Sequence, residues 1–380
     1  MTSLLASVDD VLHERVASPA PPAWAVTRSW DGALLGLDEA TLEACEARGP
    51  EAVLATHPGT PASLRALAEA VLTITEVPRW AAPSGPAVPH ASPRKVDQIE
   101  ALAALAPRGV RRVVDLGAGR GHLTRRLAQT LGVPAVGIER RGAVVEAARA
   151  IAPDPAVAFV THEVEGPLEV DPRDLVVGLH ACGGLGDALV RAAAASGAAV
   201  LLVPCCPQKI EGEVRAPLSR SGRPLDRTLL GLANLAQATA AGTSVREAAH
   251  RRGIRHALRL LLADAGVETR PGDESRGINR KQFRRALADV APQAFARRGL
   301  PAPSAAAVRE AETRAAREHA AMRRLALPRT MLARPLELAV VLDRAAALEE
   351  GVGEPPEVFE AFEASVSPRN LVIRRGAPHP

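Results

Sequence analysis

Short apolar runs alternate with amphipathic segments between residues 95 and 203. The runs have the length of strands, and the segments between them repeat apolar positions at helical spacing. Strands that are apolar almost throughout are typical of a parallel sheet covered by helices on both faces. The pattern predicts strands at 112–116, 135–139, 157–160, 174–180 and 198–203, and helices at about 121–131, 143–151 and 187–195. We therefore expect a doubly wound α/β sheet, in which ligands bind at the carboxyl ends of the strands.

The segments on either side of this pattern are mostly helical. In the first 75 residues or so, helices are expected after Ser3, Asp38 and Thr60, since these residue types commonly begin a helix. Prolines crowd residues 76–93, which we interpret as a connector.

The stretch from residue 207 to about 335 contains no strand pattern of comparable quality. A connection of that length needs structure of its own, so we expect a helical insertion. Its predicted helices are at 228–241, 244–265, 281–290 and 305–325, and a helix at 335–350 and a strand at 370–374 follow it. The expected domains are a helical region with its connector at 1–90, a ligand-binding core at 91–210, the insertion at 211–334 and a C-terminal completion of the core at 335–380.

A glycine-rich turn follows the first predicted strand. Asp115 precedes Gly117, Gly119 and Gly121 in the pattern D-x-G-x-G-x-G. Glycine allows a tight turn and a close approach of the backbone to a ligand, and the following helix directs unpaired N–H groups to the same place. A dinucleotide site would have G-x-G-x-x-G, but His122 stands where its last glycine should be. An acid two residues before the first glycine instead resembles the S-adenosylmethionine (SAM) methyltransferases.

Further candidate residues stand at the ends of the other predicted strands. Glu139 closes the second strand, where an acid can accept hydrogen bonds from ribose hydroxyls. His162 and Glu163 follow the third strand as candidates for contact with adenine. His180 ends the fourth strand, and histidine suits proton transfer near neutral pH. It is a candidate general base; alternatively, it hydrogen-bonds the cofactor or fixes the loop.

Cysteines gather at the ends of the fourth and fifth strands. Cys182 follows the fourth, and Cys205 and Cys206 follow the fifth. We interpret the adjacent pair as lining the pocket, with buried apolar side chains, redox thiols and metal ligands as the alternatives. Together with His180, these cysteines offer four zinc donors. However, there is no C-x-x-C unit, and adjacent cysteines rarely both bind one ion, so we expect no metal site.

Composition narrows the classes of partner. The chain has 380 residues, of which 47% are hydrophobic, enough for a sizeable core. Aromatic residues make up 2% and tyrosine is absent, which argues against broad stacking of bases. The net charge of +4 allows a nucleic-acid partner without requiring one.

Cysteine content and the first residues point to a cytoplasmic protein. Four cysteines in a chain of this length do not indicate a disulfide framework. The first ten residues lack the basic region and apolar core of a signal peptide. An uninterrupted apolar run of about 18 residues is also missing, so no membrane span is expected.

Taken together, these motifs resemble one group of methyltransferase domains. The resemblance rests on the turn at Asp115, on G-L-H-A-C-G at residues 178–183 and on the double cysteine at 205–206. Similar domains occur in the methyltransferase-like proteins also called ribosomal RNA adenine dimethylase domain-containing proteins, in tRNA acceptor-stem 2′-O-methyltransferases and in the glutathione S-transferase C-terminal-domain protein. The first group is the most similar, because its S-P-K-K, P-L-S, D-R and S-P-R-N motifs resemble residues 92–95, 217–219, 343–344 and 367–370. The resemblance covers about residues 88–376.

The resemblance implies a class I SAM-methyltransferase fold, Rossmann-like, with an N-terminal helical region and a large helical insertion. It also implies which residues form the site. The cofactor-binding residues would be Asp115, Gly117, Gly119, Gly121, Glu139 and His180, and the catalytic residues near the methyl group would be His180, Cys205 and Cys206.

Two departures bear on the acceptor. Pro207 and Gln208 follow the double cysteine where the tRNA enzymes have histidines, which weakens the case for 2′-O-methylation of tRNA. The N/D-P-P-[FYW] signature of amino-group methylation is also missing, because His180-Ala-Cys-Gly stands in its place. This disfavours methylation of adenine N6.

The expected function is SAM-dependent methyl transfer to RNA, either tRNA or rRNA. Arg280, Arg284 and Arg285 of the insertion are candidate phosphate contacts, with a solvated helix face as the alternative. Three other functions stay open: methylation of a protein, a non-catalytic SAM-binding interaction protein, and a nicotinamide oxidoreductase, which His122 disfavours.

Overall fold

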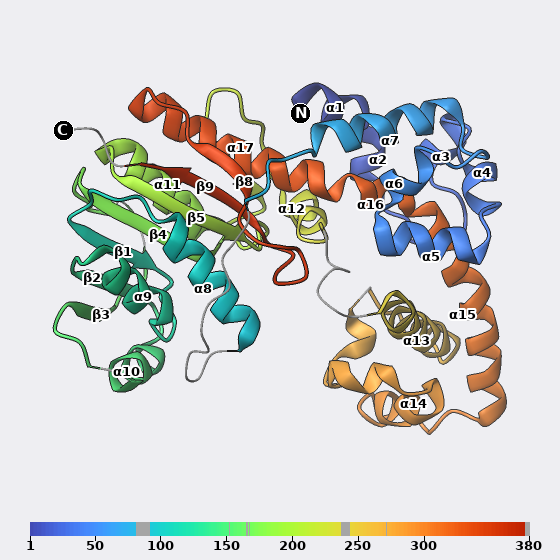
Figure 1. The fold of residues 1–380 in the computed structure, drawn as a ribbon. Coiled ribbons are helices and arrows are strands. Elements are labelled where there is room, and N and C mark those ends of the chain that lie inside the picture. The colour runs from blue at the N-terminus through green and yellow to red at the C-terminus, as the bar shows by residue number, and fades with distance from the viewer. Residues whose placement is uncertain are drawn as a thin grey trace. The chain divides into compact units, whose positions relative to one another are not determined.

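The computed structural model describes residues 1–80, 92–151, 153–164, 166, 168–236, 244–270 and 272–376. They form two compact units (Figure 1). The first, here called the sheet unit, comprises Met1–Val8, Val71–Ala241 and Leu332–Pro380. The second, here called the helical unit, comprises Asp9–Ala70 and Gly242–Met331.

The main sheet has the strand order β3-β2-β1-β4-β5-β9-β8. Neighbours among β1 to β5 pair in parallel, whereas β9 is antiparallel to both β5 and β8. The order reverses between β1 and β4, where a ligand crevice is expected outside the carboxyl ends of the strands. The doubly wound α/β class expected from the sequence is confirmed. The strands are β1 (Arg112–Leu116), β2 (Ala135–Glu139), β3 (Val157–Thr161), β4 (Asp174–Cys182), β5 (Ala199–Cys205), β8 (Glu357–Glu360) and β9 (Leu371–Arg375).

Helices cover both faces of this sheet (Figure 1). On one face Leu102 packs in the same buried cluster as Val177, and on the other Val190 packs with Val176. Successive residues of a strand point to opposite faces, so a strand between two helical layers must be apolar throughout. The covering helices are α8 (Pro93–Leu105) and α9 (His122–Leu131) on the first face, and α11 (Gly183–Ser196) and α17 (Ala333–Val352) on the second. The other elements of the sheet unit are α1 (Thr2–Ser7), α10 (Gly142–Ile151), α12 (Arg227–Ala233) and the small hairpin β6 (Val214–Arg215) and β7 (Leu225–Asp226).

The helical unit combines two segments that are far apart in the sequence. Ion pairs join them: Arg323 contacts the carboxylates of Glu39 and Glu46, each at 2.6 Å, and Arg246 contacts Glu43 at 3.0 Å. No local pattern in the sequence links these two segments. The helices are α2 (Asp9–His13), α3 (Ala23–Thr27), α4 (Asp31–Leu35), α5 (Glu39–Arg48), α6 (Pro50–Leu54), α7 (Ala62–Ile74, which ends in the sheet unit), α13 (Val245–Asp264), α14 (Leu287–Ala296), α15 (Ala305–Leu325), α16 (Leu327–Met331) and the 3₁₀ turns η2 (Asp273–Ser275) and η3 (Arg280–Arg284).

Two predicted helices were wrong in extent. The single helix expected at 281–290 is two elements, η3 and α14, because the Asn279 side chain caps a separate short turn and Ala286 is extended. The helix expected at 228–241 ends at Ala233, and part of its predicted range lies outside the described residues. Arg369 donates to the carbonyl oxygens of Ala233, Asn234 and Ala236 at 2.6–3.4 Å, which satisfies acceptors at and beyond the end of the helix. The short strand β8 was not predicted.

None of the helices in the described ranges is both long and apolar enough to cross a lipid bilayer.

Candidate active site

A cavity of about 1230 Å³ opens at the carboxyl ends of β1, β2 and β4. Gly117, Glu139 and His180 line it, each from the end of a different strand. Cys182 and Lys209 also line it. All of these residues belong to the sheet unit.

Asp115 supports the turn from below the cavity. Its side chain is buried at 2% exposure, and its Oδ2 accepts a 2.6 Å hydrogen bond from Thr124 Oγ1 in the first turn of α9. Burial raises the pKa of Asp115 to about 6, although the Thr124 hydrogen bond and the Lys95 charge oppose that rise. The carboxylate therefore ties the end of β1 to the helix that follows it.

The three glycines of the turn have different surroundings. All have positive φ, at 76° for Gly117, 55° for Gly119 and 73° for Gly121. Gly117 lines the cavity, so its bare backbone faces the space where a ligand would lie. A Cβ on Gly121 would instead collide with the ring of Phe159 on β3. Gly121 thus permits packing inside the protein, while Gly117 leaves room in the cavity.

Glu139 ends β2 with its side chain mostly buried. Its Oε1 accepts hydrogen bonds from the backbone N of Arg141 at 3.2 Å and from Arg141 Nε at 2.9 Å. Burial acts to raise the pKa of Glu139, but these bonds and the Gly119 N–H outweigh it and hold the pKa below its usual value. Glu139 is therefore a fixed negative charge on the cavity wall at neutral pH. His162 and Glu163, the residues next along this wall, also line the cavity.

His180 is held in an unusual conformation. Its φ is 63°, and the pairing of β4 with β5 shifts between Leu179 and Ala181, so His180 is the extra residue of a bulge. Its Nε2 lies 2.8 Å from Gln98 Oε1, while Gln98 Nε2 donates to the Val366 carbonyl at 3.4 Å.

The Gln98 contact determines which ring nitrogen of His180 carries a proton. With the Gln98 oxygen assigned to face the ring, the tautomer that fits this contact has its proton on Nε2 and a lone pair on Nδ1. Burial lowers the pKa of His180, and the positive charges of Lys95 and Arg369 lower it further. The neutral imidazole with a basic Nδ1 therefore prevails near neutral pH.

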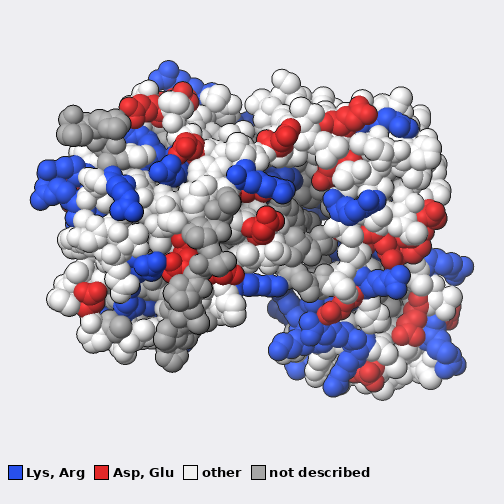
Figure 2. Space-filling model, viewed as in Figure 1, with Lys and Arg blue, Asp and Glu red and all other residues white. Residues whose placement is uncertain are grey.

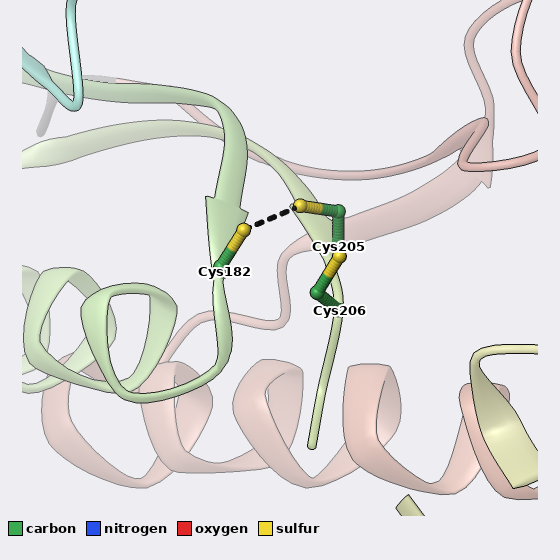
Figure 3. Close-up of side chains that lie close together, drawn as sticks. All are labelled: Cys182, Cys205 and Cys206. Atoms are coloured by element: carbon green, nitrogen blue, oxygen red, sulfur yellow. Dashed lines mark hydrogen bonds between the residues drawn. The ribbon is translucent and has the colours of Figure 1, made fainter. Parts of the chain in front are cut away.

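The three cysteines of the site come together (Figure 3). The Sγ atoms of Cys182, Cys205 and Cys206 lie within 4.8 Å of one another. Three thiols are a donor set that soft metal ions accept. However, Cys182 and Cys205 Sγ are 2.9 Å apart, closer than the roughly 3.8 Å between two sulfur ligands of a tetrahedral zinc ion. Cys182 lines the cavity, whereas Cys205 is buried behind it at 7% exposure.

Two residues near the site were missed by the sequence analysis. Gln98 fixes the His180 ring, but a glutamine on a helix carries no local signal of that role. Lys209 Nζ lies 3.7 Å from Cys182 Sγ. The rarity of lysine could have drawn attention to Lys209. Lys95, Lys209 and Lys281 are the only lysines in this arginine-rich chain.

A buried ion-pair network supports the segment that follows Cys182. Arg344 Nη2 donates to the Gly183 carbonyl at 2.8 Å, and its Nε donates to Asp187 at 2.9 Å. Arg215 joins the same Asp187 at 2.9 Å and Asp343 at 2.8 Å. The Asp343-Arg344 motif is thus a structural element of the sheet unit.

Three solved structures align with part of this chain. A chain from the complex that contains the Haloferax volcanii Trm112 methyltransferase activator is 23% identical, over 27% of this chain and 48% of its own, with a TM-score of 0.23. A SAM-dependent methyltransferase from Thiobacillus denitrificans, in complex with S-adenosyl-L-homocysteine, is 22% identical over 32% and 50%, with a TM-score of 0.25. A TehB-like SAM-dependent methyltransferase from Corynebacterium glutamicum is 20% identical over 28% and 60%, with a TM-score of 0.22. The chain therefore spans 48% to 60% of the length of these structures.

A family described as a methyltransferase domain matches residues 94–213. The matched segment holds the turn after β1 and the cavity-lining residues Glu139, His180, Cys182 and Lys209. Residues 94–213 are therefore similar to a methyltransferase domain, the class of enzyme that the sequence predicts.

Proposed function

We propose that this protein transfers the methyl group of SAM to RNA. One observation supports the proposal most strongly: the turn after β1, the Glu139 carboxylate and His180 share one cavity inside the segment that matches a methyltransferase domain. In this proposal Asp115, Gly119 and Gly121 shape the turn, and the cofactor contacts Gly117 and Glu139.

The cavity suits a nucleoside with a charged sulfur. Its volume of about 1230 Å³ is above the usual range for a small-ligand pocket, roughly 300–1,000 Å³, and leaves room for an acceptor group. Gly117 allows a close approach to the backbone, and Glu139 offers carboxylate oxygens to ribose hydroxyls. The bound cofactor would supply a methyl group already activated by its positive sulfur.

The chain's own residues then have two tasks. The cavity orients the acceptor in line with the methyl group, since positioning is the larger part of such a reaction. His180 Nδ1 takes a proton from the acceptor as it becomes nucleophilic, while Nε2 stays bonded to Gln98. Cys182, Cys205 and Cys206 form the adjoining floor, with Cys182 exposed to the cavity.

RNA is proposed as the acceptor because of the charges on the helical unit as well as the resemblance in sequence. Arg280 and Arg285 are exposed, and neither forms an ion pair with another described residue. Figure 2 shows Lys and Arg side chains gathered over the part of the helical unit that contains α13 and α14. Such positions suit contact with backbone phosphates, which dominates the affinity of proteins for nucleic acids.

The test uses the full chain in two steps. S-adenosylhomocysteine should raise the melting temperature and NAD should not, because a ligand that binds only the native state stabilises it. Incubation with isotopically labelled SAM and a cell extract should then place the label in the RNA fraction. Label in the protein fraction would indicate that the acceptor is a protein and not RNA. Binding of S-adenosylhomocysteine without any labelled product would support a non-catalytic role.

A further inference from the structure

Cys182 and Cys205 face each other across two neighbouring parallel strands. They are register partners at the carboxyl ends of β4 and β5. Adjacent strands lie about 4.8 Å apart, which falls within the range of Cα separations that a disulfide bridges. Their Sγ atoms are 2.9 Å apart and point toward one another in Figure 3. A small rotation of the side chains would bring them to the bonding distance of about 2.05 Å.

The two thiols differ in access and in charge. Cys182 lines the cavity and can meet a small oxidant, while Cys205 lies buried behind it. The Cys205 hydrogen bond and the Lys209 ammonium lower the pKa of Cys182, whereas the same hydrogen bond and burial raise that of Cys205. Cys182 is thus the more acidic of the two thiols and the one that ionises first. An accessible thiolate beside a second thiol is the arrangement of a reactive cysteine with a resolving cysteine.

We infer that Cys182 and Cys205 are a site of reversible oxidation, at which hydrogen peroxide converts the two thiols into a disulfide bond. The Cys182 thiolate attacks the peroxide oxygen, the O–O bond breaks, and a sulfenic acid and hydroxide form. The Cys205 sulfur then attacks the Cys182 sulfur, and the Cys205 proton leaves with the hydroxyl group as water. Hydrogen peroxide is thus reduced to one hydroxide and one water, and the two sulfurs are oxidised. This inference does not depend on the proposed methyl transfer.

The test uses the reduced full-length protein and hydrogen peroxide. After treatment the protein is denatured, its remaining thiols are alkylated, and it is digested with trypsin without reductant. Cleavage after Arg173, Arg191 and Lys209 places Cys182 on one peptide and Cys205 with Cys206 on the next. We expect these two peptides to be cross-linked, and the cross-link to disappear on reduction with dithiothreitol. Cys45, which is buried in the helical unit, should remain alkylated in full.

Matched variants identify the partner. Cys206→Ser should keep the cross-link, and Cys182→Ser and Cys205→Ser should both lose it, with melting temperatures showing that each variant is folded. A cross-link that survives in Cys205→Ser would overturn the assignment. So would a wild-type protein in which Cys182 is oxidised further without any cross-link, or one that retains a stoichiometric zinc ion and whose cysteines resist peroxide.

Discussion

A buried arginine of the sheet unit and two surface arginines of the helical unit have different surroundings. In the sheet unit, Arg344 is 1% exposed and is bonded to Asp187 and the Gly183 carbonyl. In the helical unit, Arg280 and Arg285 lie at the surface and form no ion pair within the described ranges. A guanidinium that is fully paired inside a protein holds structure, whereas one at the surface remains available to a phosphate. The net charge of a protein therefore says little about RNA binding unless buried, paired arginines are counted separately from exposed, unpaired ones.

The largest expected effect comes from breaking the buried network. Arg344→Leu removes a cation from among Asp187, Arg215 and Asp343 and leaves buried negative charge less compensated. We expect the free energy of unfolding to fall by about 3–5 kcal/mol, as for other buried ion pairs that lose one partner. Urea unfolding would measure it. The control is Arg285→Leu at the surface, with a change of at most about 0.5 kcal/mol. If both substitutions lowered the free energy of unfolding equally, the buried Arg344 would not differ from the surface Arg285 in its contribution to stability.

The next effect concerns His180, the proposed general base. His180→Ala should lower the rate constant of methyl transfer about 100-fold, the lower end of what general-base catalysis contributes. Binding of S-adenosylhomocysteine, measured by calorimetry, should change far less. His162→Ala is the matched control, because His162 lines the same cavity. Similar rates for His180→Ala and the wild type would remove His180 from the mechanism.

The pH dependence of the rate should follow the neutral form of His180. Burial and the charges of Lys95 and Arg369 lower the pKa of His180 below 6.5. The rate should therefore rise with pH up to this lowered pKa and level off above it. Lys95→Met removes one of the opposing charges, so the midpoint of the rate profile should move to higher pH. A midpoint that stays in place or moves to lower pH would contradict this assignment.

A smaller effect is expected at the cofactor. Glu139→Gln keeps the shape of the side chain but removes its charge, so we expect SAM affinity to fall about tenfold, since hydrogen bonds to charged groups contribute roughly 1.5–3 kcal/mol. Calorimetry with S-adenosylhomocysteine provides the measurement. Glu211→Gln is the control, because Glu211 lines the cavity but is exposed and has no predicted contact with the cofactor. Unchanged affinity in Glu139→Gln would refute its place at the ribose.

The smallest effect tests the surface arginines. Arg280→Ala and Arg285→Ala should each weaken RNA binding modestly and reduce the slope of log affinity against log salt by about 1. Filter binding at several salt concentrations would show this. Arg284→Ala should do less, because Arg284 already pairs with Glu247 at 2.6 Å. A salt slope that none of these substitutions changes would point to an acceptor other than RNA at this surface.

The parallel strands were predictable because each is an apolar run between helical repeats, and that pattern is local. Gly117, Glu139 and His180 could be assigned to one edge because each stands at a strand end, and the structure brings them to one cavity. Their roles in binding and catalysis stay predictions.

Contacts between distant parts of the chain could not be read from local patterns. Gln98 is hydrogen-bonded to His180, which lies 82 residues away in the sequence. Arg369 bonds a carbonyl group at the end of α12, more than a hundred residues away. The helical unit likewise depends on pairs such as Arg323 with Glu46, which join residues 277 positions apart. The sequence places Gly121 in the glycine-rich turn. It does not show that a side chain there would collide with the ring of Phe159, because Phe159 lies on another strand.

The bulge at His180 has a consequence for anyone who would redesign this protein. Opposite it stands Pro204, which has no N–H to offer and is tolerated in an interior strand only where the ladder is already irregular. The unpaired residue turns its carbonyl to the thiols of Cys182 and Cys205, at 3.4 and 3.0 Å. Pro204, His180, Cys182 and Cys205 thus form one connected structural feature. If the histidine alone were introduced into a regular pair of strands, the backbone there would have no bulge. The side chain would then lack the orientation that His180 has here.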